Sequence, residues 1–239
     1  MSRLILVRHA QASFFASNYD QLSPLGEFQA RALGEHWLRL GIAFDAVIVG
    51  PRVRQAKTEE LVRSVCCTQG VTWPQTDVRP EFDEHAVAQL LKEPLEELLR
   101  LHPAVRPLAA DYRHAVAPEQ LPRAFQRLFE EVCRLWCAEA PGTGSIESWS
   151  SFRARVESGL RRVLECPGRN RTIGVFTSAG NITAALCSVL NCSPSKALEL
   201  GWRLKNSSVT ELIFSGNRIT LDHFNGVSHL PDPGTWTFR

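Results

Sequence analysis

The sequence lacks the features that mark a membrane, secreted or nucleic-acid-binding protein. Its apolar runs are far shorter than a membrane span, and no charged segment with an apolar core follows the single Met. The formal net charge of the 239 residues is only +2, which provides no strong field for binding nucleic acid or a lipid surface. These absences predict a cytoplasmic protein without a nucleic-acid or membrane partner.

Metal-binding cysteine patterns are also missing. The seven cysteines are the adjacent Cys66 and Cys67 and five others at irregular spacing. No Cys-x-x-Cys pair and no quartet of Cys and His occurs, so the spacing predicts no zinc site. Reduced thiols are the ordinary state of cysteine in a cytosol. We therefore expect a protein without a metal or another cofactor.

The residues that are present are typical of a folded domain. The chain is 44% hydrophobic and 22% charged. A chain of this length buries about two-thirds of its extended surface, so it needs no disulfide or metal for stability. Arg outnumbers Lys by 23 to 4, and the composition bias of a GC-rich genome is the simplest explanation. We treat residues 1–239 as a single domain that carries an insertion.

The first 66 residues alternate between strand and helix patterns. Short apolar runs at 3–8 and 44–49 have the length and composition of buried parallel strands. A helical pattern follows each of them, the first from Pro24 after the N-cap candidate Ser23, the second over 51–66. Two successive strand–helix units predict a parallel sheet with right-handed crossovers.

The middle of the chain has a different character. Helical patterns broken by prolines extend over 90–101, 122–140 and 148–164, with little strand signal between them. We interpret residues 88–168 as a helical insertion or cap. The predicted class is therefore α/β, with three α/β/α layers, a mostly parallel central sheet and a helical insertion.

The last third returns to strands. Residues 171–177 have the pattern of a buried strand, and Ser178 leads from it into a helix over 181–190. Two further strands, at 208–214 and 218–224, are separated by a Ser-Gly-Asn turn and predict a hairpin.

Polar side chains gather at the carboxyl ends of these strands, where open α/β sheets bind ligands. The first strand ends in Arg8 and His9, the second leads to Arg54, and the late strand ends at Ser178. A fourth segment carries carboxylates within 81–84. An imidazole nucleophile, guanidinium groups that hold phosphate oxygens and a carboxylic acid that protonates a leaving group favour phosphoryl chemistry.

Several motifs extend this pattern to a known family. The sequence resembles the histidine phosphatase superfamily, the phosphoglycerate-mutase-like phosphatases, in Leu6–Ala10, Tyr19–Gly26 with Gln29-Ala30, Pro51–Thr58, Pro80–Asp83 and Val175–Gly180. The motifs occur in the family's order and leave only the central helical region uncovered. The resemblance implies a phosphoglycerate-mutase-like fold.

The resemblance also implies a role for each matching residue. His9 corresponds to the nucleophile that becomes phosphorylated, and Arg8 and Arg54 correspond to the side chains that bind the phosphoryl group. Glu81 corresponds to the acid that protonates the leaving alkoxide, although Asp83 or Glu84 is an alternative. The implied reaction is hydrolysis of a phosphate monoester without a metal.

Departures from the family pattern limit this expectation. Ser178 stands where the family has a second His that faces the phosphoryl group, and we expect it to bind phosphate as an uncharged donor. Ala10, Gly50 and Ala179 replace a glycine, a serine and another glycine. The long acid-containing motif of the true mutases is absent, which makes a phosphomutase the weakest hypothesis. The main alternative to a phosphatase is a catalytically impaired protein that binds phosphorylated ligands. We expect a small phosphorylated metabolite as the partner, and the sequence leaves a homodimer open.

Overall fold

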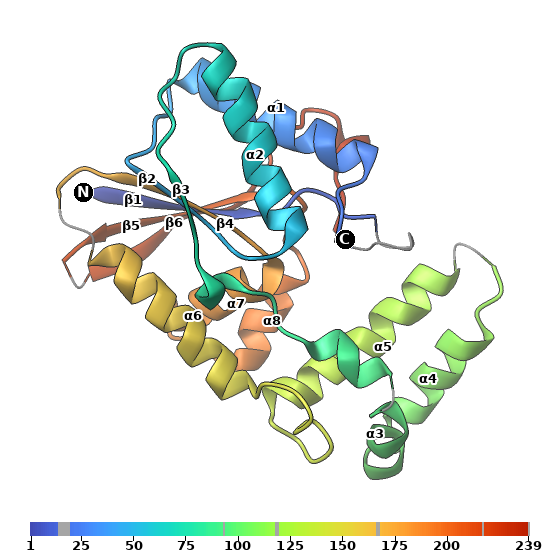
Figure 1. Cartoon of the computed structure of the whole chain (residues 1–239). Coiled ribbons are helices and arrows are strands. Elements are labelled where there is room, and N and C mark those ends of the chain that lie inside the picture. The colour runs from blue at the N-terminus through green and yellow to red at the C-terminus, as the bar shows by residue number, and fades with distance from the viewer. Residues whose placement is uncertain (14–19, 93, 118–119, 166–167, 217, 239) are drawn as a thin grey trace. The chain divides into compact units, whose positions relative to one another are not determined.

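The computed structural model describes residues 1–13, 20–92, 94–117, 120–165, 168–216 and 218–238. Tyr19 of the motif at 19–26, Cys166 and Asn217 of the predicted turn lie outside the described residues. Contacts divide the chain into two compact units, Met1–Glu84 with Arg155–Arg239, and His85–Ala154 (Figure 1). The second unit overlaps the insertion expected at 88–168.

The first unit is built on a six-stranded sheet with the strand order β3-β2-β4-β1-β5-β6. The strands are β1 Ser2–Arg8, β2 Ala46–Val49, β3 Thr76–Val78, β4 Thr172–Thr177, β5 Val209–Ser215 and β6 Arg218–Gly226. The strands β3, β2, β4 and β1 are parallel, whereas β5 runs antiparallel to β1 and pairs with β6 as the predicted hairpin. The mostly parallel sheet is therefore confirmed.

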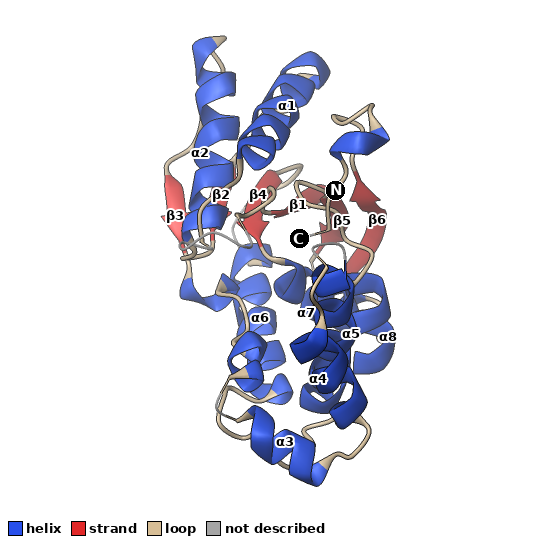
Figure 2. Ribbon diagram, turned by 90° about the vertical axis from the view of Figure 1, so that its right-hand side faces the viewer, coloured by secondary structure: helices blue, strands red, loops and turns tan. Residues whose placement is uncertain are grey.

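Helices cover both faces of this sheet, as the apolar character of both faces of β1 requires. On one face lie α1 (Pro24–Leu40) and α2 (Val53–Thr68), and on the other lie α7 (Ala179–Val189) and α8 (Pro194–Gly201) (Figures 1 and 2). Ile5 and Val7 of β1 pack into a buried cluster with Leu33 and Trp37 of α1 and Phe176 of β4. This arrangement confirms the three α/β/α layers.

The helix α1 illustrates how local sequence signals set an element's ends. The Ser23 hydroxyl accepts a hydrogen bond from the Gly26 N–H at 3.0 Å, and Pro24 occupies the first turn. The helix ends at Gly41, which has a φ of 64° that glycine adopts without strain. This helix is confirmed at the residues predicted.

In its described residues, the helical unit contains one helix more than the sequence predicts. A 3-10 turn at Val87–Leu91 precedes α3 (Leu95–Leu101), α4 (Val105–His114) and α5 (Gln120–Cys137), and α6 (Trp149–Leu164) begins in this unit. Sequence reasoning missed α4 because it interpreted Pro103 and Pro107 as helix breakers. Pro107 lies in the first turn of α4, where the missing N–H removes no intrahelical hydrogen bond.

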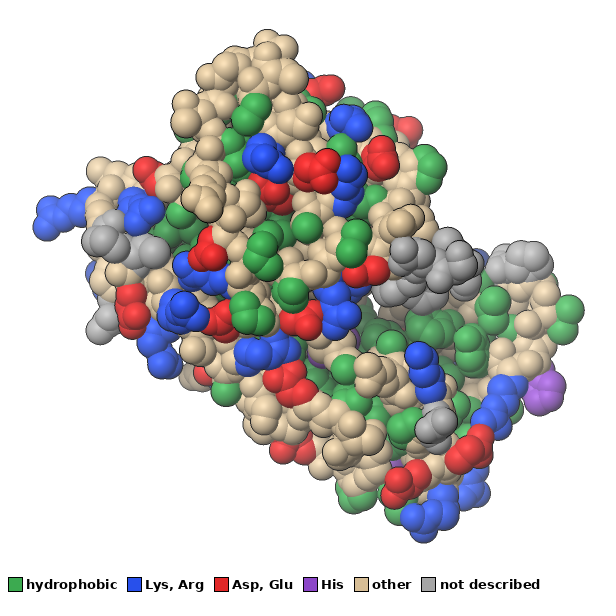
Figure 3. Space-filling model, in the orientation of Figure 1, with side chains coloured by type: hydrophobic (Ala, Val, Ile, Leu, Met, Phe, Trp, Pro, Cys, Tyr) green, Lys and Arg blue, Asp and Glu red, His purple; other side chains and the backbone are tan. Residues whose placement is uncertain are grey.

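Charged side chains of both signs are interspersed over the visible face of the molecule (Figure 3). Within the described residues, each helix is too short or too polar to cross a membrane.

Candidate active site

The carboxyl ends of β1, β2 and β4 meet at one edge of the sheet. The His9 N–H, just after β1, donates to the Thr177 carbonyl at 2.8 Å, and the Gly50 N–H, just after β2, donates to the Phe176 carbonyl at 3.0 Å. Because neighbouring parallel strands end at one level, the structure brings His9, the start of α2 and Ser178 together.

The His9 imidazole is buried, with 4% of the residue exposed, and both ring nitrogens have partners. Because a carbonyl only accepts, the ring Nδ1–H donates to the Ala10 carbonyl at 2.8 Å, which leaves the lone pair on Nε2. The Arg54 Nε–H donates to this Nε2 at 3.1 Å. Burial first, and then the positive charges of Arg54 and Arg8, hold the pKa of His9 well below its usual 6.5. The ring is neutral at neutral pH.

Arg54 connects His9 to two carboxylates. Its Nη1 contacts Asp20 Oδ1 at 2.7 Å, and its Nη2 lies 4.0 Å from Glu84 Oε2. The other oxygen of Asp20 accepts the Val53 N–H at 3.0 Å, at the N-terminus of α2. A carboxylate is favourable there because the first N–H groups of a helix lack intrahelical partners. Sequence reasoning quoted Asp20 only within a motif and gave it no role.

Arg8 binds the C-terminal segment of the chain. Its Nη1 donates to the Leu204 carbonyl, and its Nη2 donates to the Phe238 carbonyl at 2.8 Å. Only 8% of Arg8 is exposed. The guanidinium predicted to bind phosphate therefore already holds two main-chain carbonyls.

A second group of donors holds the His9 main chain. The Asn206 side-chain amide and the Ser207 N–H each donate to the His9 carbonyl at 3.2 Å. Asn206 Oδ1 in turn accepts from the Thr237 hydroxyl at 2.9 Å. Sequence reasoning missed this group, because nothing in the local sequence connects residues about two hundred positions apart.

The structure does not bring Glu81 into this site. Its carboxylate forms an ion pair with Arg162 of α6, where the missing side chain of Gly159 leaves room for the Glu81 Cβ. Glu84, which the sequence left as an alternative acid, lies near Arg54 together with Asp20. Glu81 stays a prediction as the acid, whereas Glu84 is the alternative that the structure places near Arg54.

Asp83, the other alternative acid, forms an ion pair with Arg52. Its Oδ1 lies 2.5 Å from Arg52 Nε, and the two side chains are 36% and 40% exposed. Arg52 therefore forms an ion pair at the protein surface. This pairing leaves Asp83 with a structural role at the start of α2.

Ser178 is fully buried at the N-cap position of α7, but its hydroxyl does not cap that helix. Its Oγ accepts instead from the side-chain amide of Gln55 at 2.7 Å. A Cβ on Gly50 would lie 2.2 Å from the Gln55 Oε1, so Gln55 fits only because residue 50 is a glycine. Sequence reasoning noted Gly50 and Ser178 as separate departures and missed Gln55, which connects them.

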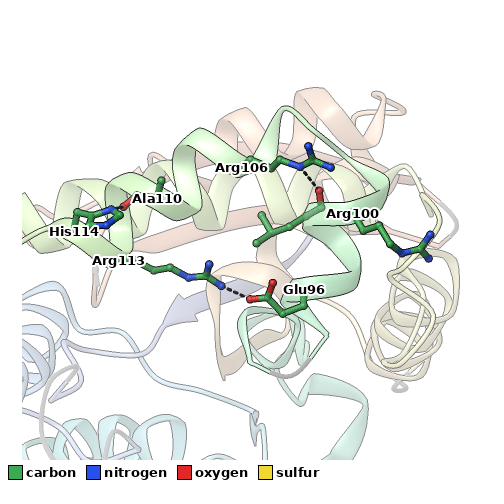
Figure 4. Close-up of a pocket in the computed structure, with 7 residues that line it drawn as sticks. Glu96, Arg100, Arg106, Ala110, Arg113 and His114 are labelled. Carbon is green, nitrogen blue, oxygen red and sulfur yellow. Dashed lines mark hydrogen bonds and ion pairs between the residues drawn. The ribbon is translucent and has the colours of Figure 1, made fainter.

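A cavity of about 430 Å³ lies elsewhere, in the helical unit, lined by α3 and α4 (Figure 4). Arg113 pairs there with Glu96, and Arg106 Nε donates to the Leu99 carbonyl at 2.8 Å. His114 Nδ1 donates to the Ala110 carbonyl, also at 2.8 Å. Among the residues that line this cavity, Glu96 and His114 are each paired with other groups and do not form a nucleophile with its general base. Among the described residues, His, Cys, Asp and Glu form no group of three that could hold a metal ion.

Comparisons with solved structures identify proteins of the same fold. A mutant phosphoserine phosphatase from Entamoeba histolytica in complex with phosphoserine superposes with a TM-score of 0.65 at 17% identity, over 96% of this chain and 100% of that chain. A phosphoglycerate mutase from Bacillus anthracis gives 0.65 at 19% identity, over 96% and 95%. A mycobacterial glucosyl-3-phosphoglycerate phosphatase gives 0.63 at 20% identity, over 95% and 99%. At these identities the similarity shows the fold.

No curated protein matches the chain significantly. A family model describes residues 85–226, more than half of the chain, as histidine phosphatase superfamily (branch 1). The matched range begins after His9, Arg54 and Glu84, so the family match and the geometry of these residues are separate observations. The family match shows that the chain belongs to the histidine phosphatase superfamily.

Proposed function

We propose that this protein is a phosphatase that hydrolyses phosphate monoesters through a phosphohistidine formed on His9. The observation that carries the proposal is the buried, neutral His9, whose Nε2 lone pair faces the guanidinium of Arg54 at 3.1 Å. A neutral imidazole is the form that attacks phosphorus, and a guanidinium neutralises the charge of the transferring group.

The first step transfers the phosphoryl group to the enzyme. His9 Nε2 forms a bond to phosphorus while the ester P–O bond breaks, and Glu84 gives a proton to the leaving oxygen. Phosphorus must approach the Nε2 lone pair, which the Arg54 Nε–H occupies. Arg54 therefore gives up this contact and binds a phosphoryl oxygen instead. Its pairing with Asp20 keeps the guanidinium oriented during this exchange.

The second step regenerates the enzyme. Glu84, now a carboxylate, takes a proton from a water molecule that attacks phosphorus, and the P–N bond breaks. His9 returns to its neutral form. Neither step needs a metal, since Arg8, Arg54 and Ser178 supply the positive charge and hydrogen bonds that stabilise the transition state.

The substrate that we propose is a small phosphorylated metabolite. Relatives of the same fold were solved with phosphoserine and with 3-phosphoglyceric acid bound. These ligands combine a phosphate monoester with a carboxylate, and two arginines beside His9 suit such anions. We also propose a cytoplasmic location, where the free cysteines of the described residues would stay reduced.

Turnover of p-nitrophenyl phosphate tests the proposal. His9→Ala removes the nucleophile and should lower kcat to the background of the uncatalysed reaction. His114→Ala removes an exposed histidine of the helical unit and should leave kcat unchanged. Equal activity of the His9→Ala variant and the wild type would contradict a phosphohistidine mechanism.

A second candidate function is a phospho-ligand-binding protein with impaired catalysis. Ser178 motivates it, because a hydroxyl at this position cannot supply the positive charge of an imidazolium. This alternative predicts phosphate binding that depends on Arg8 and Arg54 without measurable turnover. Robust hydrolysis by the wild type eliminates it.

A further inference from the structure

Gln55 is a fully buried amide for which the proposed reaction has no use. Its Nε2 donates to two acceptors, the Phe82 carbonyl at 3.2 Å and the Ser178 hydroxyl at 2.7 Å. Its Oε1 accepts the Arg52 N–H at 3.0 Å. The side chain of Gln55 therefore joins the start of α2, the loop after β3 and the end of β4.

These partners determine which end of the Gln55 amide faces Ser178. The Arg52 N–H can only donate, so its partner must be the amide oxygen, and the Phe82 carbonyl can only accept, so its partner must be the amide nitrogen. If the amide were reversed, its oxygen would face the Phe82 carbonyl, and its nitrogen would face the Arg52 N–H. An acceptor would then meet an acceptor, and a donor would meet a donor. Gln55 is therefore a donor to Ser178 Oγ.

This direction decides what the Ser178 hydroxyl can do. A hydroxyl has one proton to donate, and Gln55 occupies one of its two acceptor positions. The oxygen does not accept from the N–H groups of α7, and within the described residues its one hydrogen bond is the bond from Gln55. The proton of Ser178 is thus available for a ligand.

The position of Ser178 places that proton near the reacting atoms. Arg8 of β1 pairs in register with Thr177 of β4, so His9 and Ser178 follow neighbouring strand ends. Two consecutive residues of α2 hold them, since Arg54 contacts His9 Nε2 and Gln55 contacts Ser178 Oγ. Gly50 is required for this arrangement, because a Cβ there would also lie 2.4 Å from the Phe82 carbonyl.

We propose that Gln55 is a positioning residue that makes the buried Ser178 hydroxyl a hydrogen-bond donor to the transferring phosphoryl group. The proposal rests on the proposed function of the same site. Gln55, Ser178 and Gly50 act as a neutral unit that replaces an imidazole. A donor fixed in advance stabilises charge in the transition state without reorganising during the reaction.

Gln55→Glu tests the proposal most sharply, because it preserves shape and reverses the hydrogen bond. A carboxylate only accepts, so the Ser178 proton turns toward residue 55 and away from the ligand. Ser178→Ala removes the donor itself. The matched control is Gln69→Glu, which adds the same charge at an exposed position just after the far end of α2.

Calorimetry of orthovanadate and inorganic phosphate binding distinguishes two effects. One is the loss of the Ser178 hydrogen bond, and the other is a general electrostatic change in anion affinity. Vanadate mimics the transition state. Gln55→Glu and Ser178→Ala should therefore lower the affinity for vanadate by at least about tenfold more than the affinity for phosphate. The same variants should lower kcat by about 10²–10³. The double variant should match Ser178→Ala alone, and Gln69→Glu should resemble the wild type.

Equal losses of vanadate and phosphate affinity, or unchanged kcat in a folded Ser178→Ala variant, would overturn the proposal. Thermal melting of each variant identifies those that fail to fold, and Ser178→Cys then provides a weaker donor of similar size. If the wild type hydrolyses no ester, the proposed function fails. The vanadate-to-phosphate ratio still judges the role of Gln55, since that measurement needs no turnover.

Discussion

At the scale of single residues, burial determines the chemistry of His9. A histidine in water is half protonated near pH 6.5, whereas His9 is enclosed beside two arginines and stays neutral to much lower pH. His229 behaves in the same way, because burial and then the nearby His36 lower its pKa to about 3. Its Nε2 lies 2.8 Å from the hydroxyl of Ser207, whose N–H binds the His9 carbonyl.

These two histidines predict that the protein loses stability as the pH falls below 6.5. The unfolded chain then binds protons that the folded protein excludes, so the free energy of unfolding decreases by about 1.4 kcal/mol per pH unit for each histidine. Above pH 6.5 both states are neutral and the contribution vanishes. Urea denaturation between pH 4.5 and 7.5 measures the slope.

His229→Gln isolates one of the two contributions. This variant should show a slope smaller by about 1.4 kcal/mol per pH unit, whereas His114→Gln, at an exposed position, should keep the slope of the wild type. An unchanged slope in the His229→Gln variant would mean that His229 titrates normally in the folded protein.

The choice between Glu84 and Glu81 is also made at the residue scale. Glu84→Gln should lower kcat by about 10²-fold for alkyl phosphates, which need a protonated leaving oxygen, and less for p-nitrophenyl phosphate. Glu81→Gln breaks a pair with Arg162 outside the site and should change kcat little. Steady-state kinetics with both ester types distinguishes them, and the reverse order of effects would restore Glu81 as the acid.

At the scale of elements, the start of α2 organises the site. Asp20 binds its N-terminus, Arg54 contacts His9, Gln55 contacts Ser178, and the Thr58 hydroxyl accepts the Ala10 N–H at 3.0 Å. The first two turns of α2 thus hold the ends of β1 and β4. The position of α2 beside the sheet follows from the strand–helix repeat in the sequence.

The C-terminal segment is the second element that supports the site. The Thr237 hydroxyl donates to Asn206 Oδ1 and accepts from Gln29 at 3.0 Å. The same Gln29 amide donates to the Thr235 carbonyl at 2.8 Å, and Asn206 holds the His9 carbonyl. Residues after the last strand therefore complete the environment of the nucleophile.

Thr237→Val tests this support. The change preserves shape and leaves buried polar groups of Gln29 and Asn206 with fewer partners, so the free energy of unfolding should fall by about 1–3 kcal/mol. Thr220→Val, on an exposed position of β6, should change it by less than about 0.5 kcal/mol. Urea denaturation measures the free energy of unfolding of both variants. A loss for Thr237→Val below about 0.5 kcal/mol would show that these hydrogen bonds contribute nothing to stability.

At the scale of the whole molecule, the proposed catalytic residues all lie in the first compact unit. The parallel strands β1, β2 and β4, their carboxyl ends and the helix α1 could be predicted because each has a local signal: apolar runs, Ser23 with Pro24, and Gly41. The order of the strands in the sheet was not predicted, since it depends on contacts between distant segments. The position of Arg54 followed from its place just after a strand.

Other features could not be predicted because they depend on distant contacts. The pairing of Glu81 with Arg162, which leads us to propose Glu84 as the acid, required the position of α6. Gln55 has no local signal, since its partners belong to three separate elements. The binding of Phe238 to Arg8 joins the two ends of the chain, which sequence patterns do not relate.

The central claim is that phosphorus is transferred to His9. Rapid quenching of the wild type with a ³²P-labelled phosphate ester, followed by peptide mapping, tests it most directly. We predict a base-stable, acid-labile phosphoryl group on the peptide that contains His9, absent from the His9→Ala variant. A wild type that turns over the ester while carrying its label on another residue, or carrying none, would contradict the account.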